Sequence, residues 1–485
     1  MKTYLRKTLD YVAGNIFNKL ILLLLLPLFT RLLSPEEYAV YANLTIFVSL
    51  LSLLYLLGLQ QAIFSHFYKQ RENGYHFTLI TSIYATLFAV GIILSICIVV
   101  WRRELALLIL RDAGYAALFY WLSIMIFADV LYGMTLMVLN VMERSRAYVV
   151  VSACKNILLL MIVALISAAG IFDLNNLFFY LALAASLTAL FSLWYIRGIL
   201  RELSRDLVRK SLYSFRIMAD LLKFGVPMIP GTLALMILRA SDRYMLTYLA
   251  PDSLHAVGLY AVGYRIGMIM SFLTSIVSMV YFPYAMRIAD RPEAAVSYRN
   301  MLKYYSVIGG FLGFWIVILA PEIFKIFIAP AYFAAVVIVS FGVASNFLHG
   351  AFNIVNLTFY VTGKSTYIAL TVILGALLNI GLNLLFIPRW GISGAGGASV
   401  IAFLFIFCLN FLLARRFMNA GFRFLPVILS TAIMLLTAII NYRIPYTGYH
   451  TLLKVLLLLM MLGTVWLISG SPLRLYNKVK EKISL

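Results

Sequence analysis

The chain has 485 residues, of which 64% are hydrophobic and only 12% are charged, and its mean hydropathy is +0.98. Soluble domains carry about 25% charged residues, so this composition excludes a soluble globular protein and predicts an all-α integral membrane protein. The net charge of +21 would suit a nucleic-acid partner, but its distribution along the chain argues against one.

Apolar runs of about 20 residues, the length that spans a bilayer as a helix, predict fourteen transmembrane helices. Six lie before and eight lie after a polar, basic segment, RGILRELSRDLVRKSLYSFR, that begins at Arg197. The expected spans are residues 12–33, 38–63, 77–100, 115–141, 148–170, 176–196, 219–249, 256–285, 302–328, 332–361, 367–388, 393–414, 424–441 and 451–470.

The basic residues fall unevenly on the two ends of these spans. If both termini are cytoplasmic, 26 of the 39 Lys and Arg residues lie on cytoplasmic segments and seven lie on outer turns or outer helix ends. The positive-inside rule therefore predicts that both termini are cytoplasmic. Since this topology accounts for most of the net charge, we predict no nucleic-acid partner.

Two landmarks recur in the two halves of the chain. LLSPEEYAVY at 32–41 resembles YLAPDSLHAVGLY at 248–260, and the segment that opens at Ser145 resembles the segment that opens at Ser365. The offset from Pro35 to Pro251 is nearly the same as that from Ser145 to Ser365, so a duplicated unit of six spans is predicted. Because six is even, the repeat is parallel, which is typical of transporters with a site between the halves.

This repeat sets the expected organisation of the chain. It consists of a six-helix lobe at 1–197, a basic cytoplasmic linker at 198–217, a second six-helix lobe at 218–418, and two extra helices with a basic cytoplasmic tail at 419–485.

Three segments carry a resemblance to a known family. LLKFGVPMIPGTLALMILRASDRYML followed by VGLYAVGYRIG resembles the start of the second lobe in polysaccharide and O-antigen flippases, the Wzx-like family. NIGLNLLFIPRWGISGAGGASVIAF at 379–403 and GNIFNKLILLLLLPLFTRLLSPEEYAVYANL at 14–44 fit the same family. The resemblance covers nearly the whole chain and implies membership of the multidrug/oligosaccharidyl-lipid/polysaccharide exporter (MOP) superfamily.

The resemblance implies two six-helix bundles around a central cavity, in a monomer of the bacterial inner membrane. It implies a flippase that moves an undecaprenyl-diphosphate-linked oligosaccharide, a repeat unit of O-antigen, capsule or exopolysaccharide, from the inner to the outer leaflet by alternating access. The implied partners are this lipid-linked oligosaccharide, the bilayer and a polymerase or other polysaccharide-assembly protein, and no cofactor is expected. By similarity to lipid II flippases, spans 424–441 and 451–470 are expected to form a groove for the lipid tail.

Ionisable residues inside spans are costly, about 2.5–3.5 kcal/mol each on insertion scales, and are expected to face a cavity or a partner. Arg239, Asp242 and Arg243 have i, i+3, i+4 spacing on one helix face. At about 1.5 Å per residue from Pro251, Arg243 lies about 12 Å deep and Arg239 about 18 Å deep, and Arg265 of the next span reaches the same zone. Either Asp242 neutralises one arginine and locks two helices, or the excess positive charge binds the diphosphate through guanidinium forks.

The first lobe also carries charges within its spans. Lys19, with Asn15 one turn earlier, is expected to meet the diphosphate on the cytoplasmic side. Arg31, close to the outer end of the same span, either contacts the substrate or snorkels to the interface. Asp129 on span four and Lys155 on span five form either a structural ion pair or a proton or ion coupling site.

Other functions are disfavoured by what the sequence contains. A drug or small-molecule antiporter of the same superfamily is one alternative, although its cationic substrates would prefer an acidic cavity. A membrane polysaccharide polymerase or ligase is another, although the outer turns are short and no carboxylate pair, Ser–His set or metal cluster is evident. Cys97, Cys154 and Cys408 are expected to be core residues. Asn379 and Asn383 of span eleven either meet sugar hydroxyls or hydrogen-bond another helix.

Overall fold

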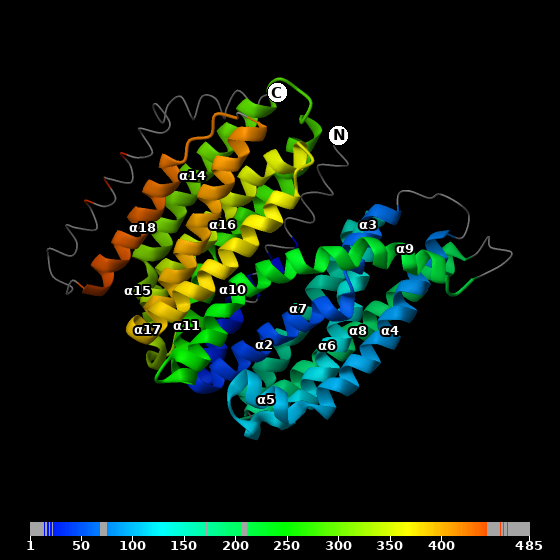
Figure 1. Ribbon diagram of the computed structural model, residues 1–485. Helices are drawn as coiled ribbons and strands as arrows, with labels where there is room; N and C mark the ends of the chain where they lie inside the picture. The colour runs from blue at the N-terminus through cyan, green and yellow to red at the C-terminus, as the bar shows by residue number, and fades with distance from the viewer. Residues whose placement is uncertain are drawn as a thin grey trace. The chain divides into compact units, whose positions relative to one another are not determined.

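The computed structural model describes residues 23–67, 75–170, 173–204, 211–418 and 420–443, together with Gly14, Phe17, Asn18, Leu20, Ile21, Leu456, Leu459 and Gly463. Every regular element in this part of the chain is a helix (Figure 1). Nine helices of the described residues are long and apolar enough to cross a membrane, or ten if one bent pair is counted as a single span. The protein is therefore an all-α, multi-pass membrane protein. The expected last span, 451–470, lies almost wholly outside the described residues.

The chain divides into two compact units, Met1–Met236 and Ile237–Leu485. The first unit contains a short apolar helix (Leu23–Leu32), α2 (Pro35–Leu56), α3 (Leu59–Phe67), α4 (Tyr75–Val100), α5 (Arg102–Leu110), the 3₁₀ helix η1 (Ala113–Ala117), α6 (Leu118–Val141), α7 (Ser145–Ala168), α8 (Leu174–Leu203), α9 (Phe215–Gly225) and η2 (Val226–Met228).

The boundary between the units falls inside α10 (Ile229–Leu249). The second unit continues with α11 (Ser253–Gly267), α12 (Met270–Ile276), the π-helical turn η3 (Val277–Tyr281), α13 (Phe282–Arg287), α14 (Ala294–Ile318), α15 (Ala320–Phe327), η4 (Pro330–Ala335), α16 (Val336–Val361), α17 (Thr366–Phe417) and α18 (Leu425–Arg443). Within this unit, α14, α16 and α18 lie side by side (Figure 1).

The unit boundary lies beyond the segment 198–217 that the sequence predicts as a linker, because α9 packs within the first unit. Gly58, at the turn before α3, lies so close to Gly225 of α9 that a Cβ on either glycine would overlap the other's backbone. The backbone N–H of Ser214 also donates to Ser82 Oγ of α4 at 2.9 Å. These contacts attach α9 to α3 and α4.

The SPEE turn shows how local sequence starts a helix. Ser34 Oγ accepts from the backbone N–H of Glu37 at 3.2 Å, and the Glu37 carboxylate accepts from the backbone N–H of Ser34 at 2.9 Å. Pro35 occupies the first helical turn, where its missing N–H costs no hydrogen bond. This capping box fixes the start of α2 at one of the two landmarks of the predicted repeat.

The expected span 256–285 is a bent pair of helices, Ser253–Gly267 and Met270–Arg287, with an angle of 44° between them. Gly267 and Gly342 allow the backbones of α11 and α16 to meet directly, since a Cβ on Gly267 would come within 2.7 Å of Gly342 Cα. Pro283 near the start of α13 has no N–H to donate, and the preceding turn widens into the π helix η3. Of these features, the close approach at Gly267 coincides with the bend, whereas η3 and Pro283 lie further along the second helix of the pair.

Helix α17 is 52 residues long because two helices run together through Gly391, whose φ of 52° and ψ of −130° are not helical. Its two arms pack against each other: Asn410 Nδ2 donates to Thr371 Oγ1 at 2.8 Å, and a Cβ on Gly375 would overlap the side chain of Ile406. Residues early in the first arm therefore meet residues late in the second, so the arms are antiparallel. They correspond to the expected spans 367–388 and 393–414.

The three cysteines do not lie in the core. Cys154 is exposed, and Cys97 and Cys408 are half-buried. The expectation that all three are core residues is wrong, because an apolar run in a membrane protein also supplies the surface that faces lipid.

Candidate functional site

Asp242 of α10 is a buried carboxylate that is only 1% exposed. Its Oδ1 accepts from Asn379 Nδ2 at 3.1 Å and from Asn383 Nδ2 at 2.8 Å. Its Oδ2 accepts from the hydroxyls of Tyr260 and Ser399, each at 2.5 Å. These partners come from α11 and from both arms of α17, so one carboxylate joins four helical segments of the second unit. Four donors around two oxygens satisfy an ionised carboxylate without a cation.

The interpretation that Asp242 neutralises a neighbouring arginine is therefore wrong. In the part of the chain that the structure describes, neither Arg239 nor Arg243 forms an ion pair with it. At about 100° per residue, Asp242 lies about 60° around the helix from Arg239 and about 100° from Arg243. The carboxylate thus points inward while the arginines occupy the other flank. Asn379 and Asn383 are fully buried and hydrogen-bond another helix, which is the second of their two interpretations.

The side chain of Arg239 is exposed on the surface of the unit, although it lies deep in a membrane-spanning helix. Its Nη2 lies 2.8 Å from Nε2 of His349 on α16 and 3.3 Å from Nδ1 of the same ring. A guanidinium can only donate, so this contact requires a neutral imidazole with Nε2 as the acceptor. The neutral His349 therefore holds Arg239 without compensating its positive charge.

Arg243 is half-buried on the same helix. Its guanidinium carbon lies 5.9 Å from the centroid of the Tyr264 ring, and its Nε is buried without a hydrogen-bond partner among the described residues. Arg265 lies one residue beyond Tyr264 in the last turn of α11 and is also half-buried. Because the ring of Tyr264 faces α10, the side chain of Arg265 leaves α11 about 100° away from it.

Three polar residues of α16 extend this group. Asn346, His349 and Asn353 recur at i, i+3 and i+7 and are all half-exposed. Asn353 Nδ2 lies 3.5 Å from His349 Nδ1, and Asn346 Nδ2 donates to the backbone carbonyl of Gly342 at 2.8 Å. We call Arg239, Arg243, Asn346, His349 and Asn353 the cationic face of the second unit.

The sequence interpretation missed the α16 part of this face. Its signal is the spacing of three polar side chains in SNFLHGAFN, one stripe on an otherwise apolar helix.

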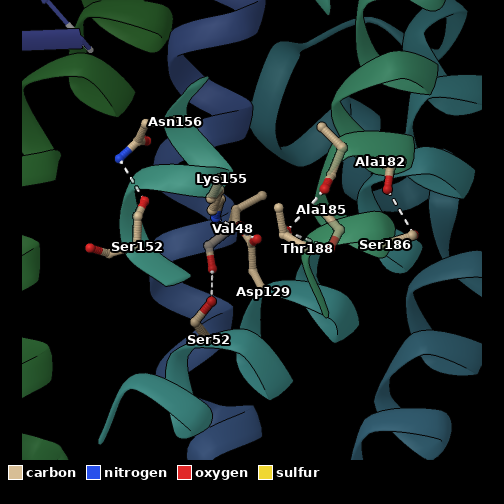
Figure 2. Close-up of polar contacts among 11 residues, drawn as sticks. Val48, Ser52, Asp129, Ser152, Lys155, Asn156, Ala182, Ala185, Ser186 and Thr188 are labelled. Carbon is tan, nitrogen blue, oxygen red and sulfur yellow. Dashed lines mark hydrogen bonds and ion pairs between the residues drawn. The ribbon is translucent and has the colours of Figure 1, made fainter. Parts of the chain in front are cut away.

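The first unit pairs its buried charges directly. Lys155 Nζ of α7 lies 2.6 Å from Asp129 Oδ1 of α6, and the two side chains are 25% and 22% exposed. The ammonium also lies 4.8 Å from the centroid of the Tyr132 ring. Figure 2 shows the pair between α6 and α7, beside Ser52 of α2. Both interpretations of these residues, a structural ion pair and a coupling site, require this contact. The contact is present, and the two opposite charges cancel.

A neutral network lies next to this pair. Asn18 Nδ2 donates to Ser152 Oγ at 3.0 Å, and Asn156 Nδ2 donates to Asn18 Oδ1 at 2.9 Å. Ser152, Lys155 and Asn156 share one face of α7, at i, i+3 and i+4 (Figure 2). This network joins the first helix of the chain to α7.

Three candidates of the first unit remain. Asn15 and Lys19 lie outside the described residues, although Asn18 of the same segment is described. Arg31 is exposed in the last turn of the helix Leu23–Leu32. Among the described residues, no group of three or more His, Cys, Asp or Glu side chains could hold a metal ion.

Solved structures with the same fold are transporters. The lipid II flippase MurJ, in an inward closed conformation, is similar with a TM-score of 0.71 at 13% sequence identity, covering 95% of this chain and 98% of that one. An inward-facing multidrug resistance MATE family transporter of the MOP superfamily is similar with a TM-score of 0.65 at 15% identity, covering 82% and 94%. At these identities the likeness establishes the fold, which is that of MurJ and MATE transporters.

Sequence comparisons give the family. An uncharacterized membrane protein of Methanocaldococcus jannaschii is 26% identical over 253 residues, which are 50% of this chain and 48% of that protein, so the chain spans about half the length of this relative. The family model described as polysaccharide biosynthesis protein matches residues 4–289. Because this match covers more than half of the 485 residues, the chain belongs to the polysaccharide biosynthesis protein family.

Proposed function

We propose that the protein is a flippase that moves an undecaprenyl-diphosphate-linked oligosaccharide from the inner to the outer leaflet by alternating access. Membership of a polysaccharide biosynthesis family and a fold shared with a lipid II flippase both support this proposal. The substrate carries an anionic diphosphate, a polar sugar chain and an apolar lipid tail. A protein that moves it must therefore offer cations and polar groups inside an otherwise apolar membrane domain.

The cationic face of the second unit is the observation that carries the proposal. Arg239 lies ten residues before the end of α10 at Leu249, which is about 15 Å along the helix and close to the middle of a bilayer core about 30 Å thick. An exposed guanidinium at that depth is stable in a water-filled lumen rather than in lipid. Arg239 and Arg243 would bind the diphosphate oxygens, and Asn346 and Asn353 would meet sugar hydroxyls.

The buried Asp242 network has a positioning role in this proposal. It fixes α10 against α11 and both arms of α17, so the arginines on the adjacent flank of α10 are presented on a rigid support. Arg265 at the end of α11 adds a further cation to the same half of the unit. In the first unit, Lys19 and Asn15 receive the diphosphate on the cytoplasmic side and Arg31 lies near its exit. The Asp129–Lys155 pair acts either as a lock between α6 and α7 or as the ion-coupling site.

The complete architecture that we propose has fourteen helices. The two arms of α17 supply two of them, and the same order of elements, α4–α5–η1–α6–α7 and α14–α15–η4–α16–α17, supports two six-helix bundles related as a parallel repeat. The two last helices would hold the lipid tail. The positive-inside count places both termini in the cytoplasm of a bacterium, with the chain in the inner membrane as a monomer.

One alternative is a drug antiporter, since MATE transporters share the fold. A cationic drug would need exposed carboxylates deep in the spans. In the described residues, Asp242 is enclosed by its four donors and Asp129 is paired with Lys155. Among the described residues deep in the spans of the second unit, the exposed charge is that of Arg239, and we therefore favour an anionic substrate. We also propose that the protein transports its substrate without acting as an enzyme such as a polymerase or ligase.

The test is complementation of a strain that lacks the gene. Arg239→Ala, Arg243→Ala and Arg265→Ala should each reduce surface polysaccharide at least about ten-fold, since a bidentate guanidinium contact to phosphate contributes about 1.5–3 kcal/mol. Lipid-linked oligosaccharide should accumulate on the inner leaflet, where a lectin cannot reach it in intact spheroplasts. Arg103→Ala, an exposed arginine at the start of α5, is the matched control and should behave as wild type. Full surface polysaccharide in all three variants at normal protein levels would refute the cationic site.

A further inference from the structure

A second basic site lies near the ends of membrane-spanning helices rather than at their middle. It is a pocket of about 700 Å³ within the second unit. This volume is typical of pockets that bind small molecules. The pocket is lined by the second and third turns of α14, the end of α17, the loop that follows it and the first turns of α18. Its lining residues are Arg299, Asn300, Lys303, Arg415, Phe422, Arg423, Phe424, Leu425, Pro426 and Leu429.

The charge of this pocket is of one sign. Four of its ten lining residues are cationic and none is acidic. Arg299, Arg415 and Arg423 are exposed, and none of these three has a carboxylate partner among the described residues. In contrast, Arg144 of the first unit forms a 2.7 Å ion pair with Glu202. Since cations that line one pocket repel one another, an anion bound there would be favoured.

The loop between α17 and α18 is shaped to present these cations. Phe422 is only 4% exposed and anchors the loop, and the ring centroids of Phe424 and Phe411 lie 5.4 Å apart. Arg415 lies over Phe411, with its guanidinium carbon 4.7 Å from the ring centroid. Gly421 has a φ of +64°, and a Cβ there would lie 3.3 Å from Arg299 Nη1. The glycine thus lets the loop pass close to Arg299.

The remaining wall is apolar and accessible. Phe424 and Leu425 are 44% and 57% exposed, beside the cations and at the start of the apolar helix α18. Cations next to exposed apolar side chains at the end of a span suit the headgroup level of a bilayer. All four cations belong to segments that the positive-inside count assigns to the cytoplasmic side.

We propose that this pocket binds the phosphate headgroup of an anionic lipid in the cytoplasmic leaflet. The guanidinium groups of Arg299, Arg415 and Arg423 contact the phosphate oxygens, and Phe424 and Leu425 contact the first carbons of the lipid. Two lipids offer this chemistry, an anionic phospholipid of the bilayer and a polyprenyl diphosphate. The test of this site does not depend on the proposed transport function, because it measures lipid binding directly.

The experiment measures lipid binding to the purified full-length protein by native mass spectrometry. Phosphatidylglycerol, farnesyl diphosphate as a soluble polyprenyl diphosphate, and zwitterionic phosphatidylcholine are titrated separately. Arg299→Gln and Arg415→Gln should each weaken binding of the anionic lipid about five-fold, the effect of removing one basic residue near an anionic headgroup. Arg416→Gln is the matched control, because it is the exposed neighbour of Arg415 and does not line the pocket.

Binding that prefers phosphatidylglycerol over phosphatidylcholine, and that weakens in the two pocket variants only, supports the site with a bilayer phospholipid as its occupant. Tighter binding of farnesyl diphosphate with the same pattern supports the site with a polyprenyl diphosphate as its occupant. Equal loss in Arg416→Gln, or equal affinity for phosphatidylcholine, overturns the proposal. All three substituted positions are exposed, so the variants should fold as wild type does, and the melting temperature of each variant checks this.

Discussion

The two units carry different charges at two positions that the predicted repeat makes equivalent. Asp129 lies fourteen residues before Glu143, which follows α6 with a φ of 55°, and His349 lies fourteen residues before Gly363, which follows α16 with a φ of 69°. In the first unit this position is an acid paired with a lysine. In the second unit it is an imidazole in contact with an arginine. The repeat that the sequence predicts would therefore retain a polar position in the helix but not its charge.

This difference indicates a division of labour between the units. In the first unit, Asp129 and Lys155 form an ion pair between α6 and α7. This contact links the two helices and leaves no net charge between them. The second unit encloses Asp242, the one buried carboxylate among its described residues, in neutral donors and leaves Arg239 and Arg243 uncompensated. A site for an anion needs this excess, and a structural core needs its absence.

The largest expected effect comes from removing the carboxylate of the second unit. Asp242→Ala leaves four buried donors without their acceptor, and at about 1 kcal/mol for each lost hydrogen bond it should destabilise the protein by about 4 kcal/mol. Thermal unfolding of the purified protein in detergent, followed by tryptophan fluorescence, measures the loss. Asp242→Asn keeps one acceptor oxygen, loses two of the four hydrogen bonds and should lose about 2 kcal/mol. Equal melting of Asp242→Ala and wild type would mean that the network does not hold these helices.

A double-mutant cycle on the first unit should give the next largest effect. Asp129→Asn leaves the ammonium of Lys155 without its counter-charge, whereas Asp129→Asn combined with Lys155→Met removes both charges. We expect a coupling energy of about 2 kcal/mol from the melting curves of the four proteins. Transport by the double variant then decides the role of the pair: retained transport identifies a structural lock, and lost transport identifies coupling.

The smallest effect on stability, with a large effect on function, should come from His349→Asp, which gives the second unit the residue of the first. The new carboxylate can pair with Arg239 and should stabilise the protein by about 0.5–1 kcal/mol. The same pair neutralises the cationic face, so surface polysaccharide should fall at least about ten-fold, the loss expected for one phosphate contact. His349→Gln, which keeps an acceptor for Arg239 but adds no charge, is the control. Normal transport by His349→Asp would contradict the division of labour between the units.

The helices were predictable from the sequence because apolar length alone selects them. The turn at Ser34 and the hairpin at Gly391 also lie where proline, glycine and polar residues interrupt the apolar runs. The partners of Asp242 were not predictable, since Arg239 and Arg243 are near in sequence while the four donors are 18 to 157 residues away.

The spacing i, i+3, i+4 correctly places the three charged residues on one side of α10. It does not reveal that Asp242 lies on a buried flank of α10 and Arg239 on an exposed one. Only about 60° around the helix axis separates the two residues. His349 was missed because a lone histidine in an apolar span carries little information. The repeat that we predict would supply the missing signal, since the offset between Ser145 and Ser365 also maps Asp129 onto His349.

The hydrogen-bond network around Asp242 also constrains the order in which the helices of the second unit assemble during synthesis. Tyr260 follows Asp242 by only 18 residues, but Asn379, Asn383 and Ser399 follow it by 137, 141 and 157. During synthesis, α10 therefore enters the membrane well before three of its four donors exist. Until the α17 hairpin arrives, a carboxylate that is later sealed from water must be hydrated, shielded by the insertion machinery or protonated to its neutral form. Closure of the second unit is thus a late event in biogenesis, set by the distance along the chain between one aspartate and its donors.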